Sequence, residues 1–327
     1  MARHFSADEI DRLRLLRSIF VSFETREGGA EPYWDSPEEL ALYDETYAQR
    51  IGWKWDAVLE ELRRRGRLPR GATVLDWGCG TAIAARRYLA ASGEAERVFL
   101  WDHAPAALEF ARERLREQHP DVEVGTELPG EPVDVLLVSH VLDELDASQL
   151  EPLLELAERA GAVLWVEPGS RRTSRRLGEL RARLAESLDV LGPCTHQATC
   201  GALAREDAWC HFFGRPPQAV YTEGPWAEFS RELGIDLRAL PYSFLALARR
   251  GTFGLEGPAA RLVARPRLTR GRAEFELCDA SGLHGVDFLQ RTDKRLYKEL
   301  EDVAGEPWLF DATLEGRRVT AMERRDT

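Results

Sequence analysis

The sequence predicts an α/β protein with a Rossmann-like, doubly wound parallel sheet, and two observations predict it. Short apolar runs such as residues 73–77 and 97–101 alternate with amphipathic stretches of helical length, which is typical of a parallel sheet with helices on both faces. A glycine-rich sequence follows the first run, at the place where such sheets bind ligands. The 327 residues suffice for one such domain of roughly 150 to 200 residues and for smaller modules.

Changes of pattern along the chain predict five segments. Helical spacing with capping patterns, at Ser6 and at Ser36 with Glu39, indicates an N-terminal helical segment. Cysteine, histidine, glycine and proline then replace apolar periodicity after a long arginine-rich helix. We expect a helical segment at 1–70, the α/β core at 71–190, a Cys-rich metal-binding insertion at 191–217, a return to the core sheet at 218–250 and a small β-rich C-terminal module at 251–327.

Charge and hydropathy exclude several classes of function. A net charge of -12 argues against nonspecific coating of nucleic acid, so DNA is not expected as a partner and any RNA contact would need local basic patches. No apolar run approaches the roughly 18 residues of a membrane span, so no membrane association is predicted. The charged N-terminus does not resemble a signal peptide, which predicts a cytoplasmic location. Five cysteines in that reducing compartment favour metal ligation or packing over disulfides.

The sequence Asp76-Trp77-Gly78-Cys79-Gly80-Thr81-Ala82 lies where the first strand meets the first helix. Glycines there let the backbone approach a nucleotide or an adenosyl ligand closely. The second strand ends at Asp102, where a carboxylate can accept hydrogen bonds from both hydroxyls of a ribose. The turn and this carboxylate together predict a ligand site.

The identity of that ligand depends on the spacing of the glycines. A dinucleotide-binding turn needs a third glycine where this chain has Ile83. The D-x-G-x-G form instead resembles motif I of class I methyltransferases, although that motif's own third glycine is Ala82 here. The resemblance implies S-adenosylmethionine as cofactor, and a glycine turn without any ligand stays the alternative. We expect the site residues to be Asp76, Gly78 and Gly80 against the methionine part, Asp102 against the ribose, and Cys79 and His140 beside them.

No catalytic residue can be assigned from the sequence. Residues 139–142 read Ser-His-Val-Leu, whereas methyltransferases that modify nucleic-acid amines usually have Asn or Asp followed by Pro-Pro and an aromatic residue. Cys79 lies within the cofactor turn and is a poor candidate for nucleophilic attack on a pyrimidine ring. His140 and Asp143 could serve as acid or base, but a packed histidine and a helix cap are the favoured interpretations.

Four cysteines form a second candidate site. Four thiolates are the usual complement of a cubane iron-sulfur cluster, and the spacings do not resemble the paired C-x-x-C knuckles of a zinc ribbon. His196 and His211 keep a Cys3His zinc site open, and buried unligated cysteines are the alternative. The four candidate ligands are Cys194, Cys200, Cys210 and Cys278.

The run PCTHQATCGALAREDAWCHF, preceded by VEPGSRRTSRRLGELRARL and followed by YSFLALARRG, carries a more specific resemblance. From about Thr73 to Trp308 the chain resembles the small-ribosomal-subunit methyltransferase family that includes mitochondrial methyltransferase-like protein 17. The resemblance implies a class I methyltransferase fold, association with the small ribosomal subunit during its assembly, and a 4Fe-4S cluster held by the four cysteines.

Two arginine-rich stretches are candidates for RNA contact. The first opens a helix and is by default a solvated face, whereas the second flanks a β turn that leads to Cys278. We hypothesise that a cluster orders this hairpin and so positions a surface for RNA. The two sets are Arg171, Arg172, Arg175 and Arg176, and Arg265, Arg267, Arg270 and Arg272.

Three functions fit these patterns. The first is a methyltransferase that uses S-adenosylmethionine and acts on small-subunit ribosomal RNA or in the assembly of that subunit. The second is a non-catalytic assembly factor that binds RNA or the ribosome and keeps the fold. The third is a small-molecule methyltransferase, which the acidic net charge would suit.

Overall fold

The computed structural model describes residues 3–23, 34, 36–254 and 257–325. The chain forms two compact units, each assembled from three separate stretches of sequence. Unit 1 comprises Met1–Leu59, Pro69–Val166 and Arg215–Leu240, and unit 2 comprises Glu60–Leu68, Glu167–Gly214 and Pro241–Thr327. Residues 1–2, 24–33 and 35 of the predicted helical segment, and residues 255–256 and 326–327 of the predicted β-rich module, lie outside the described residues.

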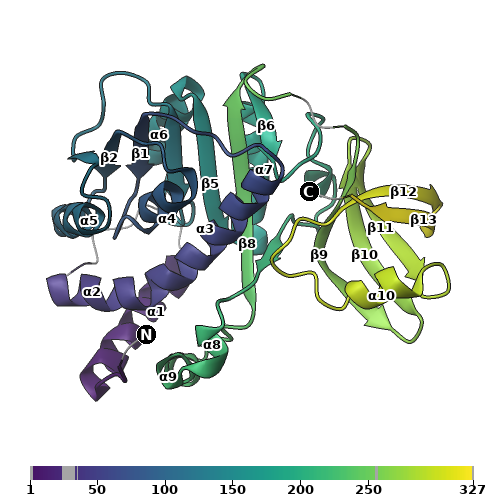
Figure 1. The fold of residues 1–327 in the computed structure, drawn as a ribbon, viewed down its shortest axis with the longest axis horizontal. Coiled ribbons are helices and arrows are strands. Elements are labelled where there is room, and N and C mark those ends of the chain that lie inside the picture. The colour runs from purple at the N-terminus through teal and green to yellow at the C-terminus, as the bar shows by residue number, and fades with distance from the viewer. Residues whose placement is uncertain (1–2, 24–33, 35, 255–256, 326–327) are drawn as a thin grey trace. The chain divides into compact units, whose positions relative to one another are not determined.

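A parallel sheet forms the centre of unit 1, as predicted (Figure 1). Its strands are β1 (Thr73–Trp77), β2 (Arg97–Trp101), β3 (Glu123–Gly125), β4 (Val135–Ser139) and β5 (Ala162–Pro168). Their order is β3-β2-β1-β4-β5 and each pair is parallel. Helices α4 (Ile83–Ser92), α5 (Pro105–Gln118) and α6 (Ala147–Arg159) connect them. The chain changes direction across the sheet between β1 and β4, so a ligand is expected at the carboxyl ends of these two strands.

Further helices complete unit 1. The first three are α1 (Ala7–Phe23), α2 (Pro37–Glu45) and α3 (Tyr47–Arg64), the last of which continues into unit 2. The predicted cap of α2 is present, since the Ser36 side chain accepts a hydrogen bond from the Glu39 backbone N–H. Two more helices, α8 (Ala219–Thr222) and α9 (Gly224–Leu233), precede the returning strand. Trp226, Phe229 and Leu233 of α9 are buried, at a helical spacing that sequence analysis had overlooked.

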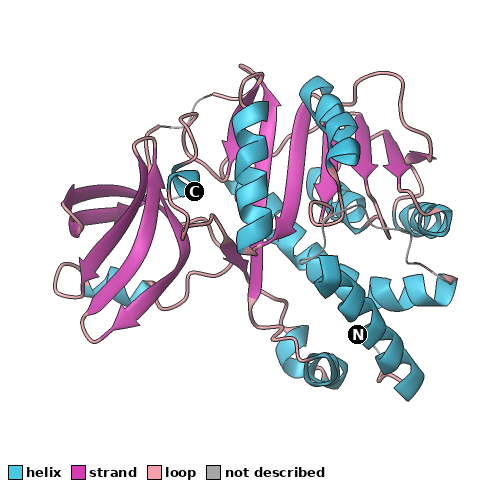
Figure 2. Cartoon of the chain, turned by 180° about the vertical axis from the view of Figure 1, so that it is seen from behind, coloured by secondary structure: helices cyan, strands magenta, loops and turns pink. Residues whose placement is uncertain are grey.

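Unit 2 contains the cysteine-rich segment and the elements around it. These elements are α7 (Arg171–Leu184), β6 (Leu188–Gly192), the 3-10 helix η1 (Gly201–Ala204), β7 (Phe212–Gly214) and β8 (Leu240–Arg249). Strands β6 and β8 pair antiparallel, and β8 is buried over most of its length. Figure 2 shows the strands and the helices from behind.

The predicted β-rich module is a closed five-stranded barrel. It consists of β9 (Ala260–Thr269), β10 (Arg272–Asp279), β11 (Gly282–Leu289), α10 (Lys294–Glu299), β12 (Leu309–Glu315) and β13 (Arg318–Arg324). The strand order β10-β11-β13-β12-β9, the parallel pairing of β11 with β13 and the helix between the third and fourth strands are the connectivity of an OB-fold. Buried aromatic side chains fill the interior: Phe275, Phe288 and Phe310.

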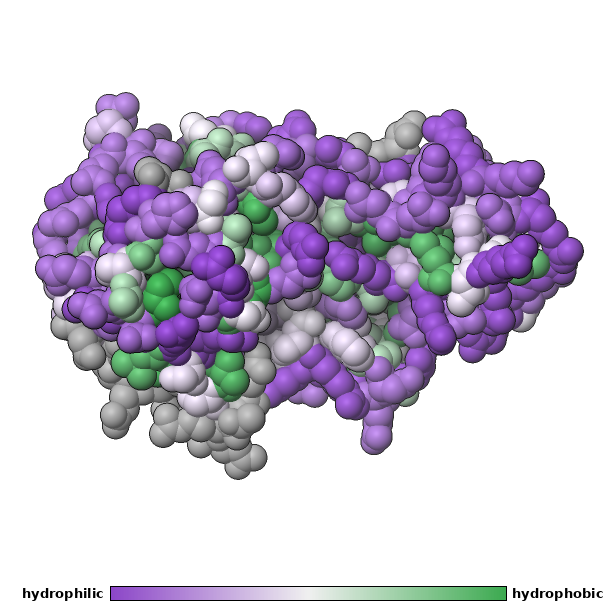
Figure 3. Space-filling model, turned by 90° about the horizontal axis from the view of Figure 1, so that it is seen from below, coloured by the Kyte–Doolittle hydropathy of each residue, from purple (hydrophilic) through white to green (hydrophobic). Residues whose placement is uncertain are grey.

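Hydrophilic side chains cover most of the face drawn in Figure 3, and hydrophobic ones show between them in smaller areas. Among the described residues, four large hydrophobic side chains are exposed: Leu15, Val21, Leu128 and Tyr221. Within the same residues, no helix combines the length and the apolar composition that a membrane crossing requires.

Candidate functional site

The glycine turn joins β1 to α4 and is shaped by left-handed backbone. Gly78 has φ +69° and Gly80 has φ +52°, and non-glycine residues rarely adopt such values. A Cβ at Gly78 would lie only 2.7 Å from the Cγ1 of Val141. Glycine is therefore required at position 78 by both conformation and space. Ala82, at the motif's third glycine position, is also left-handed, with φ +57°.

Two buried polar atoms beside this turn are unsatisfied. Asp76 is fully buried, and its Oδ2 accepts a 3.0 Å hydrogen bond from the Ala85 backbone N–H. Within the described part of the chain, Asp76 Oδ1 and Thr81 Oγ1 have no hydrogen-bond partner. Burial raises the pKa of Asp76 to about 7. Because a buried acceptor without a partner is costly, a bound ammonium or hydroxyl group would stabilise this turn.

Asp102, immediately after β2, ties the two strand ends together. One of its carboxylate oxygens accepts a 2.9 Å hydrogen bond from the Gly80 backbone N–H, and the other accepts one from the Ala104 N–H at 3.0 Å. The His103 Nδ1 lies 3.3 Å from this second oxygen, and that hydrogen bond raises the pKa of His103. The structure thus brings Asp102 to the glycine turn, and its role toward a ribose stays a prediction.

Cys79 belongs to the turn but offers no reactive thiol. It is buried, its backbone N–H donates to the carbonyl of Trp101 at 3.0 Å, and burial raises its thiol pKa well above the usual value. A thiol that stays protonated is a poor nucleophile, which agrees with its assignment to the turn.

His140 follows β4 and is held in an unusual backbone conformation with φ +57°. Its Nε2 lies 3.2 Å from the Lys54 ammonium of α3. Burial, with the charge of Lys54, lowers the pKa of His140 well below its usual value, so the imidazole is neutral and accepts this hydrogen bond. Left-handed non-glycine residues are frequent at functional sites. Sequence analysis missed Lys54, whose one signal was that lysine is rare in an arginine-rich chain.

The helix cap that sequence analysis considered for Asp143 is provided three residues later. Asp146 is the N-cap of α6 and forms a full capping box with Gln149. The Asp146 carboxylate accepts hydrogen bonds from the N–H groups of Ser148 and Gln149 at 2.8 Å and 3.0 Å. The cap interpretation of Asp143 is therefore wrong.

The four candidate cysteine ligands converge in unit 2. All four are free thiols. In every pair of them, one thiol influences the pKa of the other. Cys200 contributes to raising the pKa of Cys194, and the three other thiols contribute to raising that of Cys210. Cys194 and Cys200 do the same for Cys278. Each thiol is thus near enough to the other three to take part in these pKa effects, although 84 residues separate the first cysteine from the last along the chain. Burial raises the pKa of Cys194, of Cys210 and of Cys278.

Arginines of α7 organise the cysteine segment. Arg175 donates hydrogen bonds to the carbonyls of Ala202, Arg205 and Ala208 at 2.7 to 3.3 Å. Arg181 donates to those of His196 and Ala198, and its charge opposes the rise in the pKa of Cys194. The default interpretation of this helix as a solvated arginine face is therefore wrong for Arg175.

A buried ion network supports the same segment from another side. Both terminal guanidinium nitrogens of Arg261 donate to the Glu61 carboxylate, one of them at 2.7 Å, and Arg65 donates to it at 2.8 Å. Arg261 also donates to the Pro193 carbonyl at 3.0 Å and pairs with Cys278 in the β9–β10 register. Burial raises the pKa of Glu61, but the two arginines outweigh it, so the pKa is lowered overall.

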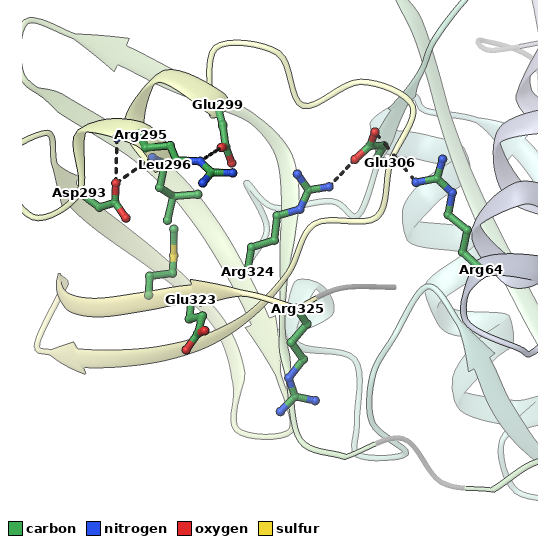
Figure 4. A pocket seen from close by; sticks show the side chains of 10 residues that line it. Arg64, Asp293, Arg295, Leu296, Glu299, Glu306, Glu323, Arg324 and Arg325 are labelled. Carbon is green, nitrogen blue, oxygen red and sulfur yellow. Dashed lines mark hydrogen bonds and ion pairs between the residues drawn. The ribbon is translucent and has the colours of Figure 1, made fainter.

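Two further observations concern metal and ligand sites. Across residues 3–23, 34, 36–254 and 257–325, no three His, Cys, Asp or Glu side chains are arranged so that they could hold one metal ion. A pocket of about 570 Å³ lies on the barrel side of unit 2 (Figure 4). Several of its charged groups are paired with one another, as Arg324 and Arg64 are with Glu306 and Arg295 is with Glu299. That pocket contains none of the predicted site residues.

Comparison with known proteins identifies the family. The model of the family described as mitochondrial small ribosomal subunit Rsm22 matches residues 48–305. The chain belongs to this family. The matched stretch includes the glycine turn, Asp102, His140 and all four candidate cysteine ligands. The resemblance to a small-ribosomal-subunit protein family that was inferred from the sequence is thereby confirmed.

Solved structures that resemble this Rsm22 family member include methyltransferases that use S-adenosylmethionine. One, from Aquifex aeolicus, is 19% identical, with a TM-score of 0.36 over 49% of this chain and 92% of that one. A candidate RNA methyltransferase from Pyrococcus horikoshii is 13% identical, with a TM-score of 0.37 over 71% and 98%. These likenesses are too distant to indicate an activity. None of the curated proteins compared with the chain matches it.

This Rsm22 family member thus combines an α/β unit, built on a parallel sheet of order β3-β2-β1-β4-β5, with a small closed barrel. The family description names a mitochondrial ribosomal subunit, and the cytoplasmic location expected from the N-terminus stays a prediction.

Proposed function

We propose that this protein binds S-adenosylmethionine at the glycine turn, holds a 4Fe-4S cluster in its four-cysteine group, and acts on small-subunit ribosomal RNA or in the assembly of that subunit. The observation that carries the proposal is the grouping of four partly buried thiols in a chain whose family is described as mitochondrial small ribosomal subunit Rsm22.

The residues of the glycine turn fit S-adenosylmethionine. The unsatisfied Asp76 Oδ1 can accept a hydrogen bond from the ammonium of its methionine part, and Gly78 leaves room where a Cβ would collide with Val141. Asp102 is held beside the turn, where it can accept from ribose hydroxyls. The cofactor would supply an electrophilic methyl group, and the contribution of the chain would be alignment.

The cysteine group fits a negatively charged cluster better than it fits four neutral thiols. Four thiolates are the usual ligands of a cubane, and the charge of Arg261 opposes the rise in the pKa of Cys210, as that of Arg181 does for Cys194. Arg261 is itself buried, and its backbone is paired with that of Cys278. Bound anionic sulfur would balance these two arginine charges.

Metal analysis of anaerobically purified protein tests the cluster. We expect about four iron and four sulfide per chain with a broad visible absorption band, and loss of both on Cys200→Ser. Cys79→Ser is the matched control, because Cys79 lies in the glycine turn of unit 1 and should leave the iron content unchanged. Zinc in place of iron would replace the cluster proposal with a zinc site.

Whether methyl transfer occurs is a separate question, and one observation favours a non-catalytic assembly factor. At the end of β4, where a catalytic group is expected, the His140 imidazole already accepts a hydrogen bond from Lys54. Incubation of cluster-loaded protein with small-subunit RNA and labelled S-adenosylmethionine distinguishes the two functions. Label in the RNA identifies an enzyme, whereas cofactor binding and co-sedimentation with small subunits without transfer identify the assembly factor. Transfer to small molecules alone would identify the third candidate function.

A further inference from the structure

The C-terminal barrel has OB-fold connectivity, but its usual ligand face is partly covered. Oligonucleotides bind OB-folds on the second and third strands, which here are β10 and β11. The cysteine segment lies on these strands, since a Cβ at Gly201 would be only 2.5 Å from the Leu283 backbone nitrogen. Arg205 of the same segment pairs with Glu276 of β10 at 2.6 Å. A nucleic acid would therefore have to use a neighbouring surface.

Such a surface begins directly beside the cysteine group. Trp209, His211 and Phe213 alternate along the chain and are all partly exposed. The rings of Trp209 and His211 are stacked, with centroids 5.0 Å apart and an angle of 13° between their planes. The ring of Phe213 follows at 5.5 Å from that of His211, edge to face. We call these three residues, which flank Cys210, the aromatic ladder.

An arginine is placed over the end of this ladder by an irregularity in β9. The guanidinium of Arg265 lies 3.9 Å from the centroid of the Phe213 ring. The β9–β10 register shifts at this point, and Ala264 has φ +64°. Its backbone N–H donates a 3.0 Å hydrogen bond to the His211 carbonyl. Bulges of this kind redirect side chains, and a strained non-glycine residue is typical of functional positions.

Further positive charge continues along β9 toward the β9–β10 turn. The side chain of Arg267 is 79% exposed and has Glu274 only at 4.0 Å, and Arg270 is exposed at the turn itself. Arg272 differs, because it pairs with Asp287 at 2.8 Å and with Glu274 at 3.1 Å. The sequence hypothesis gave equal weight to Arg270 and Arg272, and the structure favours Arg265, Arg267 and Arg270, which are exposed and less tightly paired than Arg272.

We propose that the aromatic ladder and Arg265 form a stacking platform for the bases of single-stranded RNA, with Arg267 and Arg270 contacting its phosphates. Aromatic rings beside a basic strip are the chemistry by which single strands are bound without a fixed sequence. A duplex presents no free base faces and would not fit. The inference rests on the proposed function only in taking RNA as the partner.

Fluorescence anisotropy of the full-length, cluster-loaded chain with a labelled single-stranded RNA of about 12 nucleotides tests the platform. Trp209→Leu and Phe213→Leu keep apolar bulk but remove stacking, and each should weaken binding about tenfold. Arg267→Ala should reduce the slope of log affinity against log salt by about one. The controls are Tyr221→Leu, whose ring is exposed in unit 1, and Arg295→Ala, whose side chain is 89% exposed.

The outcomes separate this inference from the proposed function. Unchanged affinity in both ladder variants, or equal affinity of the wild type for duplex RNA, overturns the platform and leaves RNA binding intact. No binding of any RNA by the wild type contradicts the RNA partner itself. Iron content is measured for each variant. If a ladder variant loses iron, photocrosslinking of wild-type protein to RNA containing 4-thiouridine decides, since crosslinks must map to residues 209–213 or the platform is wrong.

Discussion

The glycine turn and the cysteine group differ in what positions their functional atoms. In the turn, backbone N–H groups and left-handed glycines form the site, and Asp76 and Asp102 are fixed by hydrogen bonds to backbone within the same unit. In the cysteine group, side chains from a loop and from a barrel strand converge, supported by arginines from α7 and β9. The turn is therefore preorganised without its ligand. The positions of the four cysteine side chains, in contrast, should depend on the group that they bind.

Loss of the proposed cluster should show the difference between the two regions most strongly. We expect Cys200→Ser, or removal of iron by a chelator, to lower the free energy of unfolding of unit 2 by several kcal/mol, because metal binding contributes to folding where thiols converge. Binding of S-adenosylmethionine to unit 1, measured by calorimetry, should persist. If the stability of unit 2 and the binding of S-adenosylmethionine to unit 1 were lost together, the two regions would not be independent.

Removal of the Glu61 carboxylate, which pairs with Arg65 and Arg261, should have the next largest effect on stability. Glu61→Ala leaves Arg65 and Arg261 buried without their shared partner and should lower the free energy of unfolding by about 3 to 5 kcal/mol. The measurement is denaturant unfolding. The control is Glu60→Ala, whose partners Arg63 and Arg64 are on the surface, and which should change stability by less than about 1 kcal/mol. Similar values for the two variants would contradict a supporting role for the network.

The pH dependence of stability should reveal the buried carboxyl of the turn. Burial raises the pKa of folded Asp76 to about 7, above its value of about 3.9 in an unfolded chain. The folded state therefore binds this proton more tightly, so the contribution of Asp76 to stability improves as pH falls from about 7 to about 4, by at most about 1.4 kcal/mol per pH unit. Asp76→Asn should be more stable than wild type at pH 7, and this advantage should vanish near pH 4. If the stabilities of the wild type and of Asp76→Asn changed with pH in parallel, the raised pKa of Asp76 would be refuted.

A methyl group at the turn should have a smaller effect on stability but a direct one on ligand binding. Gly78→Ala places a Cβ 2.7 Å from Val141 at φ +69° and should lower stability by about 1 to 3 kcal/mol while abolishing measurable binding of S-adenosylmethionine. Gly93→Ala provides a matched control, because Gly93 has φ +68° but open space around it. Gly93→Ala should lower stability through backbone strain alone, and its binding of S-adenosylmethionine should be unchanged. Full binding by Gly78→Ala would place the ligand elsewhere.

Local sequence sufficed for the turn because its determinants are close together in the chain. The alternation of strands and helices placed Asp76, Gly78 and Gly80 at the end of β1 and Asp102 after β2, and the structure brings these ends together. His140 was named from its place after β4, but its partner Lys54 lies 86 residues earlier. A residue whose role depends on tertiary packing leaves no periodic signal.

Sequence analysis named the cysteines by their number and by family resemblance, but not their supports. Arg175 was grouped with a solvated face, although its guanidinium donates to three carbonyls of the cysteine segment. Arg261 was not singled out, because a single arginine at the start of a predicted strand gives no sign that it will be buried against Glu61, 200 residues away. The barrel closure, through pairing of β11 with β13, is equally non-local.

The division of unit 2 into three stretches of sequence sets an order of events during synthesis. Three of the four thiols have been translated by residue 210, but the fourth, Cys278, follows 68 residues later, after the stretch that belongs to unit 1. At about 5 to 20 residues per second, the ribosome needs several more seconds to add it. A nascent chain therefore cannot present a complete set of four thiols until most of the barrel's second strand has been made, so the proposed cluster cannot gain its fourth ligand before then.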